Sequence, residues 1–301
     1  MTPAIGIDLG GTNIKAALVD TQSSQTLATL SKPTRDGEFE GDTPRFAHTV
    51  RGIVHEFESQ VGQKLAVGLS APGLAHSSGL YIDWMPGRMH GLEKLDWATF
   101  LDRDCRVLND AHAALLGEIW AGAAQGTQDA FMLTLGTGVG GAIWSGGRLL
   151  KGKIGRAGHL GHISTDTHGP RDDFNTPGSL EDAIGNQTIT QRGEGRYATT
   201  HSLLDAYAAG DAHAEKVWLT SVRHLAASIA SLINVLDPEI VILGGGIATG
   251  AQDRLLKPLQ QALNDFEWRP GGNQARIVPA ELGDSAGCLG AVFNLLQSAQ
   301  I

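Results

Sequence analysis

Short apolar runs that end in glycine-rich turns alternate along the chain with longer amphipathic segments. The apolar runs predict strands over residues 4–9, 14–20, 65–73, 106–108, 130–135, 239–243 and 276–279. Apolar residues at helical spacing predict helices over about residues 43–61, 111–124, 213–236, 252–266 and 286–298, with a short helix that ends near Leu101. The polar segment 21–41 is interpreted as the end of a hairpin followed by a loop. Strands interspersed with helices indicate an α/β protein.

The first glycine-rich turn joins the two N-terminal strands in the segment AIGIDLGGTNIKAALVD, residues 4–20. Gly10 and Gly11 can adopt backbone angles closed to other residues, so successive N–H groups can point outward and form an anion nest. Thr12 adds a hydroxyl donor and Lys15 a cation, and Asp8 could hold a hydrated Mg²⁺ beside a phosphate. The alternative is an ordinary hairpin that binds no ligand, because Gly-Gly turns are common in hairpins.

A second glycine-rich turn follows the strand 130–135 in the segment GTGVGGAIWSGG. Thr137 lies there between Gly136 and Gly138, in the position that Thr12 holds in the first turn. Two turns of one design in a chain favour a shared task, such as holding a phosphate chain from both sides. A third glycine cluster, 244–246, follows a buried strand, and backbone without side chains could lie against an adenine ring there. Its alternative is a strand-to-helix turn that needs glycine for space.

Polar candidates for chemistry also lie at strand ends. Asn109 and Asp110 stand between a short strand and a helix, where Asp110 is either an N-cap or a general base. The turn that ends in Gly73 follows a buried strand, a common place for ligand contacts. In the polar segment 155–185, His159 and His162 form a His-x-x-His pair. Zinc needs about four N or S ligands and no cysteine lies nearby, so sugar hydroxyls suit this segment better.

Composition narrows the function further. With 301 residues and 42% hydrophobic content, the chain can form a large core and most simply two domains. A formal charge of −9 without a basic block argues against nucleic acid as a partner. No stretch approaches a membrane span and no signal region precedes the first strand, so a cytoplasmic location is expected. Cys105 and Cys288 are isolated, which excludes a disulfide framework.

The order of these parts resembles the actin-like superfamily of sugar kinases and Hsp70 ATPases. Within it, the segments LNDAHAALLGE, LTLGTGVGGA, GxxGH and GSLE look like the ROK family (repressors, open reading frames, sugar kinases), and the likeness covers nearly the whole chain. The resemblance implies a two-domain, ribonuclease-H-like α/β fold with ATP and sugar in an interdomain cleft. It places residues 1–108 and 284–301 in an N-terminal domain and residues 109–283 in a larger domain. It also implies a homodimer, as in many relatives.

By position, the resemblance makes Asp110 the general base for phosphoryl transfer from ATP to a hexose or hexosamine hydroxyl, usually on C6. It assigns sugar contacts to Asn109, His162, Glu181, His159, Gly73 and Arg88. It assigns ATP and its Mg²⁺ to Asp8, Gly10, Gly11, Thr12, Asn13, Lys15, Gly136, Thr137, Gly138, Gly245 and Gly246. Phosphoryl transfer needs position and charge stabilisation more than covalent chemistry, so one carboxylate with a phosphate clamp suffices.

Three departures from the family pattern matter. The cysteines of the family's zinc motif align with Asp172, Phe174 and Ser179, so no structural zinc is expected and packing and hydrogen bonds should hold this loop instead. His159 replaces the acid of the family's ExGH motif, which should alter sugar choice. Where many members have Pro-Asn, this chain has Pro86-Gly87-Arg88, and Arg88 could supply the missing contact.

Two other functions compete with the kinase. Sugar-sensing repressors of the family carry an N-terminal DNA-binding domain, for which the first turn, so close to Met1, leaves no room. A sugar-binding protein with little kinase activity, acting as a sensor or regulator, is favoured by the altered sugar loops.

Overall fold

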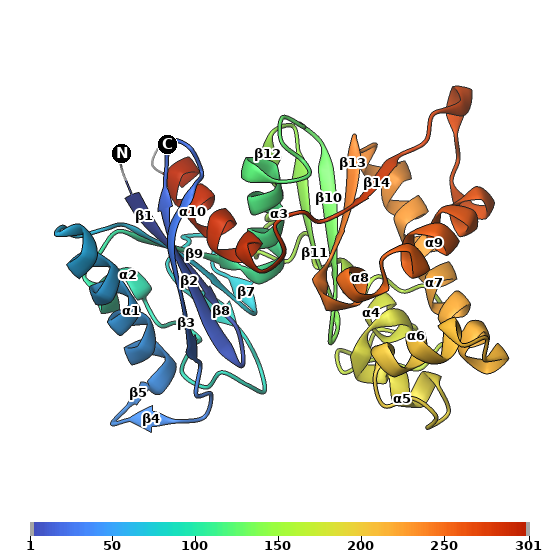
Figure 1. The fold of residues 1–301 in the computed structure, drawn as a ribbon, viewed down its shortest axis with the longest axis horizontal. Coiled ribbons are helices and arrows are strands. Elements are labelled where there is room, and N and C mark those ends of the chain that lie inside the picture. Colours follow the sequence, from blue (N-terminus) through green and yellow to red (C-terminus); the bar gives the residue numbers. More distant parts are fainter. Residues whose placement is uncertain (1–2, 299–301) are drawn as a thin grey trace. The chain divides into compact units, whose positions relative to one another are not determined.

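The structure is a computed structural model that describes residues 3–298 and divides into two compact units (Figure 1). Unit 1 comprises Met1–Gly126, Lys151–Ala157 and Glu281–Ile301, and unit 2 comprises Thr127–Leu150 and Gly158–Ala280. This division differs from the sequence-based boundaries, which assign residues 109–126 to the larger domain. Helix α3 (Asp110–Ala121) groups with unit 1 because it packs closely on α10 (Ala286–Ser298), where a side chain at Gly290 would overlap the Ala113 carbonyl.

Each unit is built around a five-stranded sheet. The strands of unit 1 are β1 (Pro3–Leu9), β2 (Asn13–Asp20), β3 (Thr26–Pro33), β4 (Phe39–Glu40), β5 (Thr43–Pro44), β6 (Val67–Ala71), β7 (Leu74–Ala75), β8 (Ile82–Trp84) and β9 (Cys105–Asn109). Its other helices are α1 (Arg45–Val61), α2 (Trp97–Leu101) and the 3₁₀ turn η4 (Gly283–Ser285). The strands of unit 2 are β10 (Ala130–Leu135), β11 (Val139–Ser145), β12 (Arg148–Leu149), β13 (Ile240–Gly244) and β14 (Arg276–Pro279). Its helices are η1 (Leu160–His162), α4 (Leu180–Ile184), η2 (Asn186–Thr188), α5 (Ile189–Arg192), α6 (Thr200–Ala208), α7 (Ala212–Leu236), α8 (Gly245–Ala251), α9 (Asp253–Phe266) and η3 (Pro270–Gly272).

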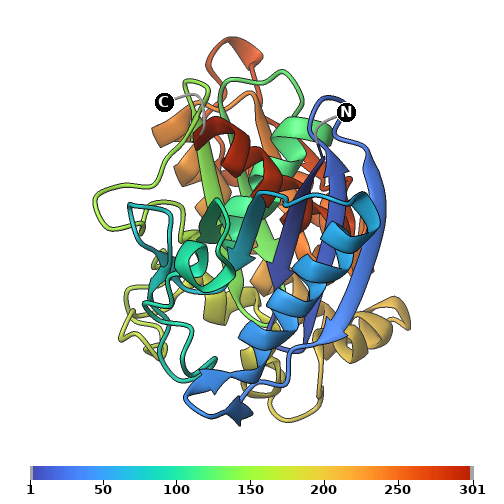
Figure 2. The ribbon, with the colours of Figure 1, turned by 90° about the vertical axis from the view of Figure 1, so that its left-hand side faces the viewer.

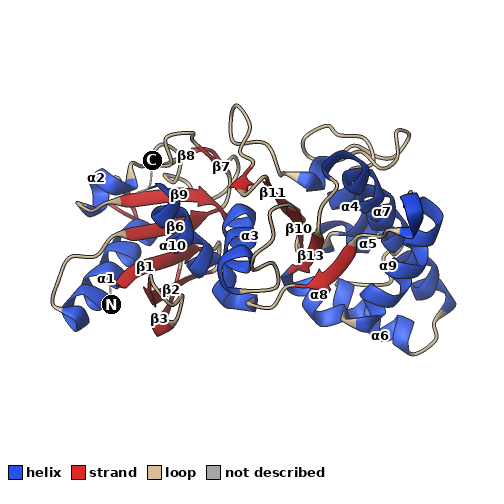
Figure 3. Ribbon diagram, turned by 90° about the horizontal axis from the view of Figure 1, so that it is seen from above, coloured by secondary structure: helices blue, strands red, loops and turns tan. Residues whose placement is uncertain are grey.

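The two sheets have the same topology. The strand order is β3-β2-β1-β6-β9 in unit 1 and β12-β11-β10-β13-β14 in unit 2. In both, the first three strands pair antiparallel and the last two add in parallel, as the red strands of Figure 3 show. Both glycine-rich turns therefore occupy the same place, between the central strand and its antiparallel neighbour. The expected α/β fold is confirmed.

In unit 1, successive side chains of β1 point to opposite faces of the sheet, so they contact two different helices. Ile5 and Ile7 are buried in one cluster with α1, which lies across the front of the blue strands in Figure 2. On the opposite face, α10 approaches so closely that a side chain at Gly6 would overlap the Cys288 carbonyl. Asp8 has the same parity as Gly6, so its carboxylate faces α10.

In unit 2, the core joins the sheet to the six helices α4 to α9. Phe131 and Leu133 of β10 pack in one buried cluster with Trp218, Leu225 and Ile229 of α7. By length and composition alone, α7 could cross a membrane, so the expectation that no stretch approaches a span needs correction. Its buried residues belong to this core, and core helices of soluble proteins share that property.

Several elements escaped the sequence patterns, among them α6, β3 and α8. The segment interpreted as a loop at 21–41 contains β3, an edge strand whose residues are alternately half-buried and exposed. The glycine cluster 244–246 opens α8, which the predicted helix over 252–266 missed because three glycines carry a low helix propensity.

Candidate functional site

Asp110 is the first residue of α3 and is reached by solvent. The N-cap of that helix is Asn109, whose Oδ1 accepts the N–H groups of Ala111 and His112 at 3.0 and 3.2 Å. Desolvation by the surrounding protein raises the pKa of Asp110 to about 6, with the charge of Asp8 adding and that of Arg88 opposing. A carboxylate of this pKa is suited to accept a proton near neutral pH.

Asp8 lies near Asp110 at the end of β1. Ser70 donates its hydroxyl to Asp8 Oδ1 across 2.8 Å, and a side chain at Gly287 would lie 2.7 Å from the Asp8 carboxyl carbon. Desolvation raises the pKa of Asp8, against the hydrogen bond from Ser70 and the charge of Lys15. Its position beside the first glycine turn, which is predicted to bind phosphate, is compatible with the expected hydrated Mg²⁺, because a carboxylate with water as further ligand is the usual protein contribution to such a site.

The first glycine turn is held by residues outside the hairpin. Thr34 donates its hydroxyl to the Gly10 carbonyl at 2.6 Å and its N–H to the Thr12 carbonyl at 2.9 Å. Neither Gly10 nor Gly11 takes a left-handed conformation, contrary to the expected reason for glycine there. Space is the reason at Gly10, where a Cβ would lie 2.9 Å from the Asn13 carbonyl oxygen.

Two cations lie at this turn. The guanidinium of Arg88 comes 3.7 Å from where a Cβ of Gly11 would be, so the arginine predicted to bind sugar lies at the phosphate turn and acts on Asp110 as well. Lys15 forms an exposed ion pair with Asp284 at 2.6 Å. Exposed ion pairs contribute little stability, so the ammonium of Lys15 is bound only weakly.

Gly73 and Asn109 form one local structure. Asn109 is buried; it donates from Nδ2 to the Gly73 carbonyl at 3.0 Å, and its amide also hydrogen-bonds the carboxyl of Asp110. Gly73 has a φ of +99°, and a Cβ there would lie 2.6 Å from the Trp84 carbonyl oxygen, so the turn requires glycine.

In unit 2, the second glycine turn is fastened to α4 and η2. The carboxylate of Glu181 accepts the Val139 N–H at 3.0 Å, and a side chain at Gly138 would overlap that carboxylate. The N–H groups of Asn186 and Gln187 donate to the carbonyls of Gly136 and Thr137 at 2.9 and 2.8 Å. The predicted sugar residue Glu181 is therefore part of the support of the phosphate turn.

The third glycine cluster meets the second turn. Gly245 has a φ of +84°, and a side chain there would overlap the backbone of Leu135, the residue before Gly136. Gly246 has open space where a Cβ would be. The backbone at Gly246 can therefore be approached by a flat ligand, as the adenosine assignment requires.

The histidine segment lies over the start of β11. A side chain at Gly161 would overlap the Val139 carbonyl, so His159 and His162 at the two ends of η1 are brought to the turn. His162 is exposed, packs its ring on Phe174 at 5.0 Å, and has Nδ1 3.7 Å from Asp172 Oδ2.

These residues do not fit a zinc ion. Phe174 has no donor atom, and the Ser179 hydroxyl caps α4 by accepting the Asp182 N–H at 3.3 Å. Asp172 and His162 supply two ligands where zinc takes about four. Across residues 3–298, no group of three or more His, Cys, Asp or Glu side chains is placed to hold a metal ion. The loop is held by hydrogen bonds instead, among them the Ser164 hydroxyl to the Pro177 carbonyl at 2.6 Å.

The structure thus brings the predicted residues together in two sets, one in each unit. The set in unit 1 comprises Asp8, Gly10, Gly11, Thr12, Arg88, Asn109, Asp110 and Gly73. The set in unit 2 comprises Gly136, Thr137, Gly138, His159, His162, Glu181 and Gly245. The supporting residues Ser70, Thr34 and Gln187 were missed; only Ser70 carried a signal, since it opens the predicted Ser-Ala-Pro-Gly turn that ends in Gly73, although the structure places it within β6.

Comparisons with known proteins identify the family of the chain. A family model described as the ROK family matches residues 4–298. The chain is 30% identical to a glucokinase of Halalkalibacterium halodurans, over 97% of this chain and 94% of the relative. A crystal structure of a ROK hexokinase from Thermus thermophilus superposes with a TM-score of 0.87 at 30% identity, over 99% of each chain. A ROK family glucokinase from Streptomyces griseus in complex with glucose and AMPPNP has a TM-score of 0.77 at 26% identity, over 98% of this chain and 99% of its own. The expected sugar-kinase fold is confirmed, and the chain belongs to the ROK family.

Proposed function

We propose that this chain phosphorylates the C6 hydroxyl of a glucose-like hexose or hexosamine with ATP, with Asp110 as the general base. The broader prediction of a sugar kinase is confirmed by the family and by the glucokinase and hexokinase relatives. The carbon atom and the base are the parts that this proposal adds.

The observation that carries the proposal is the environment of Asp110. Asp110 is exposed on unit 1, desolvation by its neighbours raises the pKa of its carboxyl to about 6, and it lies near Asp8, Arg88 and the first glycine turn. The neighbouring Asn109 is the N-cap of α3, and Asp110 accepts the Ala111 N–H on Oδ1 at 2.8 Å, so Oδ2 is the oxygen that would take a proton from an attacking hydroxyl.

The remaining residues bind and orient the reactants. Backbone N–H groups of the two glycine turns would hold the phosphates of ATP, and Arg88 would add charge at the first turn. Bound through water at Asp8, Mg²⁺ would neutralise phosphate charge. Asn109, Gly73, Glu181, His162 and His159 would bind the sugar hydroxyls, and the Gly246 backbone would lie against adenine.

A coupled ADP-release assay across a panel of hexoses and hexosamines tests this function. Turnover of at least one sugar is expected, with the product phosphorylated at C6, and the variant Asp110→Asn should lose about 10²–10⁴-fold in kcat. Sugar binding by calorimetry with no turnover of any sugar would support a non-catalytic sugar-binding protein instead. Full activity in Asp110→Asn would reject the base.

We further propose that the protein is a cytoplasmic homodimer. Val235, near the end of α7, is 77% exposed and offers an apolar contact for a second copy. Both cysteines are buried and free, as is usual in a reducing compartment. Sedimentation of the protein and of Val235→Lys would test the dimer.

A further inference from the structure

Asp172 carries a buried carboxylate in which one oxygen accepts two hydrogen bonds and the other accepts none. Its side chain is 2% exposed. Oδ1 accepts the N–H groups of Phe174 and Thr176 at 3.0 and 2.8 Å, whereas Oδ2 is buried and has no hydrogen-bond partner. A buried carboxylate oxygen without a partner is costly, so its retention calls for a role.

The imidazole of His162 lies near that oxygen, with Nδ1 3.7 Å from Oδ2. This distance exceeds a direct hydrogen bond, so the attraction between the two groups is electrostatic. Burial opposes the charge on Asp172, but the hydrogen bonds from the Thr176 and Phe174 N–H groups, together with the nearby Ser179 hydroxyl and the charge of His162, outweigh it and lower the pKa of its carboxyl. Asp172 therefore presents a fixed negative charge to His162.

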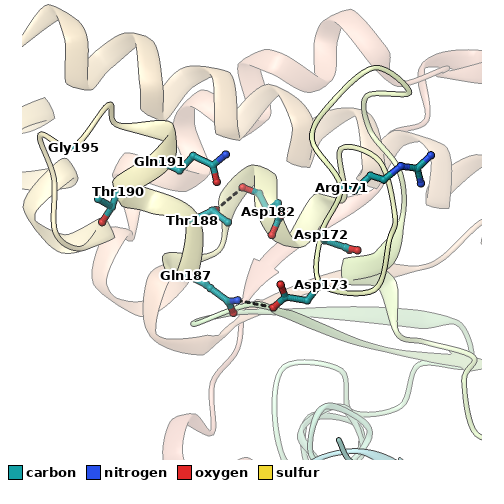
Figure 4. Close-up of a pocket in the computed structure, with 9 residues that line it drawn as sticks. All are labelled: Arg171, Asp172, Asp173, Asp182, Gln187, Thr188, Thr190, Gln191 and Gly195. Carbon is teal, nitrogen blue, oxygen red and sulfur yellow. Dashed lines mark hydrogen bonds between the residues drawn. The ribbon is translucent and has the colours of Figure 1, made fainter. Parts of the chain in front are cut away.

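The loop that carries Asp172 is itself anchored on the support of the second glycine turn. A cavity of about 510 Å³ is lined by this loop and by the segment that follows α4, and its lining residues are drawn in Figure 4. Across it, Gln187 donates its side-chain amide to Asp173 Oδ2 at 3.1 Å. The backbone N–H of the same Gln187 binds the Thr137 carbonyl. The position of Asp172 is thus set relative to the phosphate turn.

We propose that Asp172 is a positioning residue for His162. Its carboxylate draws the Nδ1–H of the imidazole toward Oδ2 and leaves Nε2 as the acceptor for a sugar hydroxyl, because the tautomer of a histidine is set by the partner of its other nitrogen. The ring of Phe174, packed against the imidazole, restricts its rotation. The inference rests on the proposed role of His162 as a sugar contact.

The test compares Asp172→Asn with Asp265→Asn, a matched control on an exposed aspartate of α9. Asparagine keeps an acceptor for the Phe174 and Thr176 N–H groups but removes the charge. Asp172→Asn should raise the sugar KM about tenfold while kcat and the KM for ATP change less than about twofold. Asp265→Asn should leave all three within about twofold. In a His162→Gln background, Asp172→Asn should have no further effect.

A spectroscopic measurement makes the proposal independent of how the variants fold. ¹⁵N chemical shifts of the imidazole nitrogens in the unaltered protein, assigned by their loss in His162→Gln, should show the Nδ1–H tautomer of neutral His162. A dominant Nε2–H tautomer overturns the proposal. So does an unchanged sugar KM in Asp172→Asn when His162→Gln raises it, or an equal effect of Asp172→Asn in both backgrounds. If His162→Gln leaves the sugar KM unchanged, the sugar contact fails, and the tautomer still decides the pairing with Asp172.

Discussion

The carboxylate of Glu181 accepts the backbone N–H of Val139 across 3.0 Å, where the second glycine turn passes into β11. The backbone of Gly138 fits against the same carboxylate only because it lacks a Cβ. A residue expected to bind sugar therefore also shapes the turn expected to bind phosphate. Substrate affinity and phosphate affinity should be linked through this one side chain.

Replacing Glu181 in two ways separates its two roles. Glu181→Gln keeps an oxygen for the Val139 N–H, so the KM for sugar should rise while the KM for ATP changes little. Glu181→Ala removes that oxygen as well, and the loss of a charge-assisted hydrogen bond, worth about 1.5–3 kcal/mol, should raise the KM for ATP about tenfold or more. Steady-state kinetics with each substrate varied in turn measure both values. An equal ATP KM in the two variants would contradict the link.

The pH dependence of the reaction should report Asp110. Its pKa is raised to about 6, so the carboxyl is ionised above that pH and takes up a proton below it. Because a general base acts only when deprotonated, kcat/KM should fall as the pH drops through about 6. A pH–rate profile in buffers of constant ionic strength measures this limb. An acid limb at pH 4, the usual range for an aspartate, would show that the carboxyl is not desolvated.

Arg88 should influence the pH at which kcat/KM falls. Its positive charge lowers the pKa of Asp110, so Arg88→Gln should move the acid limb of kcat/KM to higher pH. Arg45→Gln, which removes an exposed arginine paired with Glu40, is the matched control and should leave the limb in place. An unshifted limb in Arg88→Gln would place the guanidinium too far from Asp110 to act on its charge.

The central elements of the site could be predicted from the sequence because backbone and pattern specify them. β10, β14 and α10 have the predicted limits. Asp110 falls at the strand-to-helix junction where the apolar pattern changes period. Both glycine turns stand out because each places glycines directly after a buried apolar strand.

The supports of the site could not be predicted, because they are contacts between residues far apart in the chain. Ser70 reaches Asp8 over 62 positions, and Thr34 reaches the Gly10 carbonyl over 24. The reason for glycine at position 10 was also misjudged, because the crowding by Asn13 depends on how the turn closes. Serine and threonine are common surface residues, so only the fold distinguishes these two.

Two glycines of the second turn should respond differently to a methyl group. At Gly138 a Cβ would overlap the Glu181 carboxylate, whereas at Gly136 nothing lies within 4 Å of the Cβ position. Gly138→Ala should therefore lower the free energy of unfolding by about 1–3 kcal/mol, the usual cost of overpacking. Gly136→Ala should change it by less than about 1 kcal/mol. Denaturant titrations of the two variants measure the difference, and equal stabilities would contradict the packing at Gly138.

Glu118 should be among the residues of unit 1 most sensitive to substitution. It is fully buried, and its two oxygens accept the N–H groups of Ala123, Glu281 and Leu282 at 2.8, 3.0 and 2.9 Å. These donors lie in the segments through which the chain leaves unit 1 after α3 and returns to it before α10. Glu118→Ala removes a fully buried carboxylate and leaves three backbone N–H groups without their acceptor, so the free energy of unfolding should fall by about 3–5 kcal/mol.

Two companion variants sharpen the measurement. Glu118→Gln keeps one oxygen for Glu281 and Leu282 but turns an amide N–H₂ toward the Ala123 N–H, so it should lose an intermediate amount of stability. Glu215→Ala removes an exposed carboxylate on α7 and should stay within about 0.5 kcal/mol of the unaltered protein. Urea titration of the three variants ranks their free energies of unfolding. A loss below about 1 kcal/mol in Glu118→Ala would mean that water replaces the carboxylate as the partner of these N–H groups, and that the two connecting segments are held by their apolar contacts alone.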